Sequence, residues 1–424
     1  MRKMMWTGIG WFMCFAAHAQ TPAKTLRPMD YGTYMEQVWK QHPGYAAEKL
    51  KVSVAEAGAQ VARVFNDPQL SVEYADNDER RLQMGRSVSV ELGKTFSFGK
   101  RNARIDLAES EKELNESLLE DYFHRLRAGA TLAWFEALKQ AALHAVRENS
   151  CENIRRLAEA DSIRFALGKI TDVDALQSRL EAEKASAGLL QSHAEQLNAC
   201  EALSVWTGVF DPHILPNPAG ALHPQVRAYD TDALLQTALE NRADLAAALK
   251  NVEVARKALQ VVRRERNTDV DLAIGYNYNT EVRNEIAPAP AFNGLTLGIA
   301  VPLKFSNANK GALRAAELRR QQAELDYRQA ELEIQTAVMQ SLRTYFAQLE
   351  QVRRFETGML DRAGAILQGK LYSYERGETS RLEALVAQQT YDDLHTAYIE
   401  TVFNSLAALI ELERNAGIWD FAIE

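Results

Sequence analysis

Two stretches of this chain share one pattern: YERGETSRLEAL at Tyr374–Leu385 and FALGKITDVDAL at Phe165–Leu176. Each reads aromatic residue, two residues, glycine, four residues, aliphatic residue, acid, alanine, leucine. Gly168 and Gly377 can adopt the left-handed backbone angles that end a helix. The pattern therefore predicts two tips, each joining one helix to the next.

The residues after each glycine predict how the second helix of each tip begins. Thr171 and Ser380 are good helix N-caps, and Asp174 and Glu383 follow three residues later. The spacing T-x-x-D or S-x-x-E forms a capping box, in which the two side chains bond each other's backbone N–H. Capping alone explains both acids, and it is compatible with a further role.

Other motifs also occur twice in the same order, so we interpret the chain as a duplicated domain rather than a solenoid. QHPGYAAEKL at Gln41–Leu50 resembles NRADLAAALK at Asn241–Lys250, and SFGKRNAR at Ser97–Arg104 parallels KFSNANKG at Lys304–Gly311. Each half is predicted to contain a helix, two strands, a very long helix and a return helix. The expected helices are about Asp30–Asn66, Asn102–Phe165 and Thr171–Val205, then Thr231–Asn267, Asn309–Tyr374 and Ser380–Asn415.

These motifs divide the chain into a signal peptide at 1–19, a first repeat at 20–206, a linker at 207–230 and a second repeat at 231–424. The linker contains four of the eleven prolines, which argue against regular structure there.

The N-terminus is typical of an exported protein. Arg2 and Lys3 precede an apolar stretch that ends in Ala17-His18-Ala19, so we expect cleavage after Ala19. Cys14 raises the alternative of lipidation, although the residues before it are bulky for a lipoprotein signal.

The two cysteines of the mature chain are predicted to be free and mostly buried. Folding the hairpin about Gly168 places Cys151 opposite roughly residue 185, about 20 Å from Cys200 along the helix. A disulfide needs Cα atoms within about 7 Å of each other.

Four segments alternate between apolar and polar residues, which predicts strands with one apolar and one wet face. Each has about the 9–11 residues that cross a bilayer, although a soluble half-buried sheet alternates in the same way. Because four strands cannot close a barrel and an open edge is not tolerated in lipid, spanning strands require several chains, and twelve strands from three chains leave a pore. The segments are PQLSVEYAD, GRSVSVELGKTFSFG, TDVDLAIGYNYN and LTLGIAVPLKF.

The long helix of the second half carries two apolar stripes, each with a period of seven residues. They lie about 200° apart around the helix, so the helix is predicted to have a neighbour on each side, as in the wall of a tube. A helix in the middle of an ordinary bundle is the alternative. The stripes are Leu318, Leu325, Leu332, Met339, Phe346 and Ala316, Ala323, Ala330, Ala337.

Composition and motifs argue against several function classes. The net charge of -8 disfavours nucleic acid binding. The chain contains no P-loop, H-E-x-x-H or G-x-S-x-G motif, so we expect no enzyme and no cofactor. His193, His213 and His223 are not at ligand spacing, so we expect no metal site.

Taken together, the signal peptide, the duplication, the paired strands, the FGK turn at Phe98–Lys100 and the two tips resemble the TolC-type outer membrane efflux channel family. The resemblance covers nearly the whole mature chain. It implies a mainly α fold with membrane β structure: a trimeric α-barrel across the periplasm, and a shared 12-stranded β-barrel in the outer membrane. The implied function is a passive export conduit in a tripartite pump.

The resemblance also assigns roles to the tips. Tyr374 matches a tyrosine that holds the periplasmic mouth shut in some members, and Glu383 matches the first acid of a ring at the mouth. Asp174 occupies the position of Glu383 in the first repeat, so it is the matching candidate for a ring of acids at the mouth. Val386 replaces the second ring acid, and Thr379 stands where some members carry a gating arginine. The tip residues that resemble adaptor-contacting positions are Gly168, Lys169, Gly377 and Glu378.

The implied partners are two further copies of the chain, outer membrane lipid, a periplasmic adaptor (membrane fusion) protein and an inner-membrane pump of the RND type. Metal cations and drugs are both candidate substrates. The alternative interpretation is a soluble periplasmic coiled-coil adaptor or scaffold.

Overall fold

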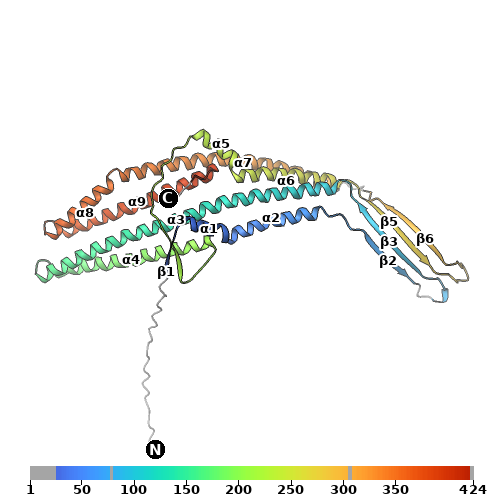
Figure 1. The fold of residues 1–424 in the computed structure, drawn as a ribbon, viewed down its shortest axis with the longest axis horizontal. Coiled ribbons are helices and arrows are strands. Elements are labelled where there is room, and N and C mark those ends of the chain that lie inside the picture. Colours follow the sequence, from blue (N-terminus) through green and yellow to red (C-terminus); the bar gives the residue numbers. More distant parts are fainter. Residues whose placement is uncertain (1–24, 77–79, 304–307, 421–424) are drawn as a thin grey trace, which may run out of the picture.

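The computed structural model describes residues 25–76, 80–303 and 308–420. The predicted signal peptide therefore lies outside the described residues. The molecule is elongated, with a β-sheet at one end (Figure 1). At the other end lie the two turns that connect α3 to α4 and α8 to α9. Both termini of the described chain lie near the middle. This arrangement places the two duplicated tip motifs side by side, at the end farthest from the sheet.

The two halves have the same order of elements, except that η1 occurs only in the first and that the single helix α3 corresponds to α7 and α8 in the second. The first half contains β1 (Thr25–Met29), α1 (Tyr31–Gln41), α2 (Pro43–Ala62), β2 (Gln69–Ala75), the short 3-10 helix η1 (Arg80–Leu82), β3 (Ser87–Phe96), α3 (Lys100–Ala166) and α4 (Asp172–Thr207). The second contains β4 (Ile214–Pro218), α5 (Thr231–Asn241), α6 (Ala243–Glu265), β5 (Val270–Asn279), β6 (Phe292–Ala300), α7 (Ala308–Glu356), α8 (Met359–Glu375) and α9 (Arg381–Ala416).

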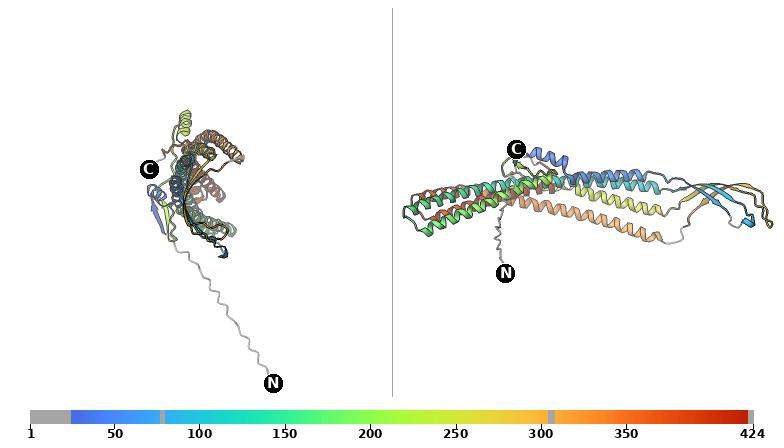
Figure 2. Two further views of the ribbon diagram at one scale, coloured as in Figure 1. Left: turned by 90° about the vertical axis from the view of Figure 1, so that its right-hand side faces the viewer. Right: turned by 90° about the horizontal axis from the view of Figure 1, so that it is seen from below.

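The four alternating segments form one antiparallel sheet in the order β2-β3-β5-β6. The two halves meet in its centre, where β3 pairs with β5, for example Val90 with Tyr276. Apolar residues of all four strands are exposed on the sheet, including Val72, Leu92 and Leu297. The sheet is curved (Figure 2) and its two outer strands, β2 and β6, are unpaired along one edge within the described chain.

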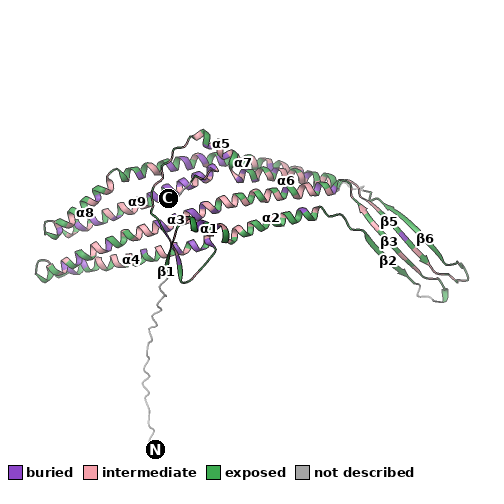
Figure 3. Ribbon diagram, viewed as in Figure 1, coloured by how far each residue is buried: buried purple, intermediate pink, exposed green. Residues whose placement is uncertain are grey.

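The helices extend from the sheet as a layer, which we call the wall. Near the sheet they pack in the order α2, α3, α6, α7, and towards the tips in the order α4, α3, α9, α8. None of the described helices combines the length and the apolar character needed to cross a membrane. The large fully buried side chains gather near the middle of the molecule, where α1, α5 and the linker cover the wall (Figure 3).

The prediction of one continuous first helix in each half is wrong. The segment Asp30–Asn66 breaks at His42 and the segment Thr231–Asn267 breaks at Arg242, both of which have extended backbones. At each break the glycine that ends the return helix packs against the backbone. A Cβ atom at Gly208 would lie 2.5 Å from the Gln41 carbonyl oxygen, and one at Gly417 would lie 3.2 Å from the Arg242 nitrogen. The same glycine contact therefore recurs at both breaks, and at the first one Pro43 also begins α2, which disfavours a helical backbone at His42.

The prediction of one long helix at Asn309–Tyr374 is also wrong. The first half has an unbroken α3 of 67 residues, but in the second half Thr357 and Gly358 separate α7 from α8. Gly358 has φ of 83°, a left-handed conformation that interrupts the helix. Both apolar stripes of this helix end before the joint, since Arg353 follows Phe346 and Thr344 follows Ala337 at the next position of each stripe.

The linker is more regular than its prolines suggested. Residues Ile214–Pro218 form β4, which pairs in parallel with β1. Both are edge strands of a two-stranded sheet, and proline is tolerated at such positions because one side of each strand needs no ladder hydrogen bond. The prediction for the cysteines is confirmed, since Cys151 and Cys200 are free and buried.

Candidate functional site: the paired helical tips

Both tips end their first helix in the way their glycines predict. Gly168 has φ of 68° and Gly377 has φ of 79°. The amide of the following residue reaches back five positions, so Lys169 N–H donates to the Arg164 carbonyl at 2.9 Å and Glu378 N–H to the Ser373 carbonyl at 2.9 Å. This is the Schellman arrangement, which satisfies carbonyls left free at a helix end.

The two return helices are capped differently. Thr171 and Asp174 form the full reciprocal capping box. In the second tip Ser380 Oγ accepts from the Glu383 amide at 3.3 Å, but the Glu383 carboxylate turns to other partners. It accepts from Lys370 Nζ at 2.5 Å and from Thr379 Oγ1 at 2.7 Å. Half of the second predicted capping box is therefore replaced by an ion pair to α8.

The hydrogen bonds of these acids hold both in the ionised form. The Lys370 and Thr379 hydrogen bonds lower the pKa of Glu383 from 4.5 to about 2. The Thr171 side chain lowers the pKa of Asp174. Both carboxylates are exposed, so each remains charged across the physiological pH range.

A chain of hydrogen bonds joins the two tips. Buried Asp161 on α3 accepts from the Tyr374 hydroxyl on α8 and from the Ser178 hydroxyl on α4. Arg381 on α9 donates to Ser178 Oγ at 2.9 Å and to the Asp174 carbonyl at 3.0 Å. We call Asp161, Arg164, Ser178, Tyr374 and Arg381 the tip clasp.

Arg164 completes the tip clasp from α3. Its guanidinium lies 4.2 Å from the centre of the Tyr374 ring and donates to the Tyr374 carbonyl oxygen. It also lies 3.6 Å from the Asp161 carboxylate. The positive charge of Arg164 therefore offsets the negative charge of Asp161, whose side chain is only 2% exposed. Burial, and then the hydrogen bond to Asp161, raise the pKa of Tyr374 to about 12. The tyrosine therefore remains a hydrogen-bond donor at any physiological pH.

The predicted site residues fall into two groups. Asp174, Tyr374, Gly377 and Lys169 line a cleft of about 320 Å³ between the two tips, together with members of the tip clasp. Glu383 and Glu378 line a separate hollow on the α8 side. Space around Gly168 is open. Asp174 and Glu383 therefore do not meet within one chain.

The sequence analysis missed four members of the tip clasp: Asp161, Arg164, Ser178 and Arg381. The first two lie one to two turns before Gly168, and Arg381 lies two residues after Thr379. A search for charged residues within one turn before the first tip motif would have included Asp161 and Arg164, and Arg381 is a charged residue inside the second motif. Ser178 carries no comparable signal. Pairing them required knowing that α3 lies beside α8 and α9.

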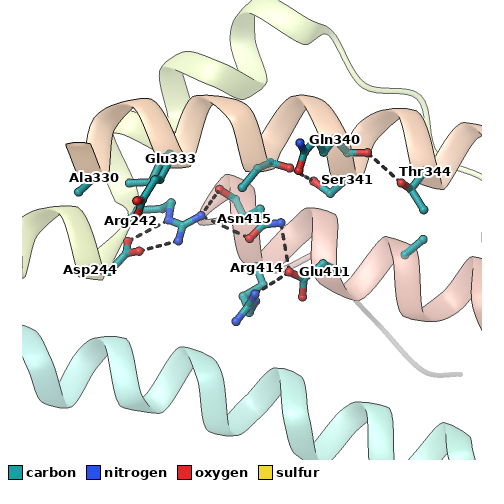
Figure 4. A pocket seen from close by; sticks show the side chains of 13 residues that line it. Arg242, Asp244, Ala330, Glu333, Gln340, Ser341, Thr344, Glu411, Arg414 and Asn415 are labelled. Atoms are coloured by element: carbon teal, nitrogen blue, oxygen red, sulfur yellow. Dashed lines mark hydrogen bonds and ion pairs between the residues drawn. The ribbon is translucent and has the colours of Figure 1, made fainter. Parts of the chain in front are cut away.

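A larger pocket, of about 440 Å³, lies between α7 and α9 near the middle of the wall (Figure 4). Its charged side chains are used in internal contacts. Arg242 donates to both Asp244 oxygens and to the Asn415 carbonyl, and Arg414 pairs with Glu411 at 2.5 Å. These contacts attach the break between α5 and α6 to the end of α9, and we assign the pocket a structural role.

Comparison with known proteins agrees with this geometry. The chain is 24% identical to the cobalt-zinc-cadmium resistance protein CzcC of Cupriavidus metallidurans, over 88% of this chain and 86% of that protein. It is 24% identical to outer membrane protein TolC of Vibrio cholerae, over 82% and 77%.

Among solved structures, CusC superposes with a TM-score of 0.74 at 18% identity, covering 92% of both chains. The open state of the MtrE channel of Neisseria gonorrhoeae superposes with a TM-score of 0.73 at 15% identity, covering 91% of this chain and 88% of that one. The shared fold is the α-barrel joined to a β-barrel.

The sequence profile of the family described as outer membrane efflux protein matches residues 35–209 and 234–417. One matched segment covers most of each half of the chain, and the first extends three residues past residue 206. Members of this family are transport channels that assemble as trimers and work with an adaptor and an inner-membrane pump, which decides against the soluble scaffold interpretation. The chain belongs to the outer membrane efflux protein family, and it is the outer membrane channel of a tripartite efflux pump, with a long helical extension into the periplasm.

Proposed function

We propose that this channel exports divalent transition-metal cations and that the tip clasp holds its periplasmic mouth closed. The choice of cargo is supported by the similarity to a cobalt-zinc-cadmium resistance protein, over most of both chains. Drugs are the second candidate cargo, because the chain is equally identical to a TolC. Deleting the gene in its own host, with pump and adaptor intact, and measuring intracellular zinc, cobalt and cadmium separates the two.

Assembly of three copies would cover surfaces that a single chain leaves open. On α7 the alanine stripe is largely covered by neighbours, with Ala316 and Ala323 buried, but Leu318, Leu325 and Leu332 are exposed. At the opposite edge of the wall, α2 exposes an apolar stripe that includes Leu50 and Val54. Pairing α7 of one copy with α2 of the next would bury both stripes and bring β6 beside β2. This head-to-tail contact closes a ring of three chains and twelve strands.

The outer surface of the tips suits a helical partner. Leu167, Val173 and Leu382 are exposed around the two turns, beside Gly168 and Gly377. We assign this surface, with Lys169 and Glu378, to the helical hairpin of the periplasmic adaptor, which in turn joins an RND-type pump. An isoleucine at Gly377 should block export while the trimer still assembles.

One observation carries the closing role of the tips: Asp161 of the first hairpin accepts from Tyr374 of the second. Because Asp161 is only 1% exposed, breaking this bond leaves a buried carboxylate short of a donor. Separating the hairpins is therefore costly unless a partner compensates.

Tyr374→Phe tests this role, with Tyr372→Phe as its matched control. Tyr372 lies on the same helix and is exposed, and the Arg376 guanidinium lies 4.6 Å from the centre of its ring. In planar bilayers we expect Tyr374→Phe to raise the single-channel conductance several-fold and Tyr372→Phe to leave it unchanged. Equal conductance in both variants and the parent would show that the tip clasp does not close the mouth.

A further inference from the structure

Two histidines from different helices face each other across the first hairpin. His144 on α3 and His193 on α4 have ring centres 5.4 Å apart, with the ring planes inclined by 48°. His144 is half-buried and His193 is exposed. His144 Nδ1 is buried, and it has no hydrogen-bond partner among the described residues. A buried imidazole nitrogen without a partner is unusual, because its lost hydration is not replaced.

The spacing of the two rings fits a shared metal ion. Zinc lies about 2.0–2.1 Å from a ligating imidazole nitrogen and hence roughly 3.2 Å from the ring centre. Two ring centres 5.4 Å apart then subtend about 115° at the metal, close to the tetrahedral angle. The α3–α4 packing therefore holds the two imidazoles at a suitable separation, and binding requires one nitrogen of each ring to turn towards the ion.

We propose that His144 and His193 form a two-histidine binding site for a borderline divalent metal ion of the zinc or cobalt class. Imidazole suits these ions, whereas calcium and magnesium prefer oxygen ligands. No group of three or more metal-ligating side chains is found in the described part of the chain, so water completes the coordination and the ion exchanges readily. The site does not depend on the tip clasp or on the identity of the exported cargo.

The two residues are 49 positions apart in the sequence, which is why ligand spacing along the chain did not reveal them. They meet because the hairpin turns at Gly168, which lies midway between them. A bound ion would tie α3 to α4 and stabilise the hairpin by linkage, since it binds the folded hairpin only.

The test uses the purified, untagged trimer in detergent, titrated with zinc chloride and separately with magnesium chloride by calorimetry. The test variant is His144→Gln/His193→Gln, and the control is His213→Gln/His223→Gln, which removes two histidines outside the hairpin. We expect one zinc ion per protomer in the parent and the control, at least a tenfold weaker affinity in the test variant, and no magnesium binding in any of them.

Two further readouts separate metal binding from packing. Zinc should raise the melting temperature of the parent but not of the test variant, and cobalt bound to the parent should give the intense visible bands of tetrahedral coordination. Equal zinc affinity in parent and test variant would overturn the proposal. So would a variant that changes stability without metal but leaves the zinc response intact, because the pair would then be only a packing layer. Without metal, the single-channel conductance of the test variant should equal that of the parent. A negative result for metal binding would therefore not affect the proposal that the tip clasp closes the mouth.

Discussion

The two hairpins share the same duplicated tip motif, yet the outgoing helix is continuous in the first and interrupted in the second. In the first, α3 runs unbroken for 67 residues and its return helix begins with a reciprocal capping box. In the second, Gly358 interrupts the outgoing helix. The Glu383 amide still donates to Ser380, but the Glu383 carboxylate accepts from Lys370 and Thr379. From this comparison we expect the second hairpin to bend at Gly358 more readily than the first bends along α3.

The bonds between the hairpins lie where such bending would strain them. Besides the tip clasp, a buried polar bridge joins α3 to α9 higher up. Asp392 accepts from Ser150 at 2.5 Å and from Gln388 at 2.9 Å, and Asn153 donates to Gln388 at 3.0 Å. Burial raises the pKa of Asp392, and the hydrogen bonds from Ser150 and Gln388 oppose this rise. We expect the second hairpin to open from the tip towards this bridge.

The largest effect is expected from Asp161→Ala, which removes the shared acceptor of the tip clasp. Tyr374 and Ser178 lose their common partner, and we expect the tips to be destabilised by about 2–4 kcal/mol. Hydrogen exchange of the tip amides measures this, and faster exchange should appear in both hairpins. Asp172→Ala, at an exposed acid in the first turn of α4, is the control and should change the exchange little. Exchange confined to one hairpin would contradict a clasp that joins them.

The joint in the second hairpin can be tested with two glycines near each other in the chain. Gly358 has φ of 83° with room for a Cβ atom, so Gly358→Ala should cost about 1 kcal/mol through backbone strain alone. Gly369 lies inside α8 with nothing near its Cβ position, so Gly369→Ala should stabilise the helix by about 0.5–1 kcal/mol. Thermal unfolding checks the opposite signs. A stabilising Gly358→Ala would mean that the joint is not held in its left-handed conformation.

The two helix caps provide a smaller comparison. The Thr171 hydroxyl accepts from the Asp174 amide at 3.2 Å and donates to the Asp174 carboxylate at 2.7 Å, so Thr171→Ala should cost about 1–2 kcal/mol of local stability. Ser380→Ala removes two longer bonds to Glu383, at 3.3 Å and 3.4 Å, and should cost about 0.5–1 kcal/mol. Hydrogen exchange of the first turns of α4 and α9 measures both. If the two variants were equivalent, the difference in capping between the tips would carry no energy.

The smallest effect is expected from Glu383→Gln. Because Lys370 already offsets the carboxylate, the cation preference of the channel should fall only slightly. The folded pKa is depressed from 4.5 to about 2, so the ion pair is fully present above about pH 4.5 and is lost only as the pH falls towards 2. Reversal potentials should therefore give the parent the same cation preference at pH 7 and pH 5. Identical selectivity in parent and variant at both values would leave Glu383 only its structural role.

Local sequence signals predicted the ends of elements well where one or two residues set the backbone conformation. Gly168 and Gly377 ended their helices, and Thr171 and Ser380 began the next ones. The alternating segments became the strands of one sheet. The break at Gly358 was missed because an isolated glycine is often tolerated within a helix.

The other misses share a cause, which is contact between distant segments. Arg242 carries no local signal of a helix end, but the Gly417 turn packs against it. Pro216 and Pro218 argued for an irregular linker, but β1 offered an edge to pair with. In the sequence, Asp161 looks like any surface acid of a long helix. Only the structure shows that Tyr374 and Ser178 both donate to it.

The sequence by itself determined the class of this protein: an exported, duplicated chain with amphipathic strands, long helices and two glycine tips. These features follow from periodicity, capping and backbone freedom, which act over a few residues. Only the tertiary structure decided which residues work together, as in the tip clasp, the break at Arg242 and the pairing of His144 with His193. The contacts between different helices among these join residues 17 to 213 positions apart, and their existence depends on how the helices pack, which no local pattern encodes.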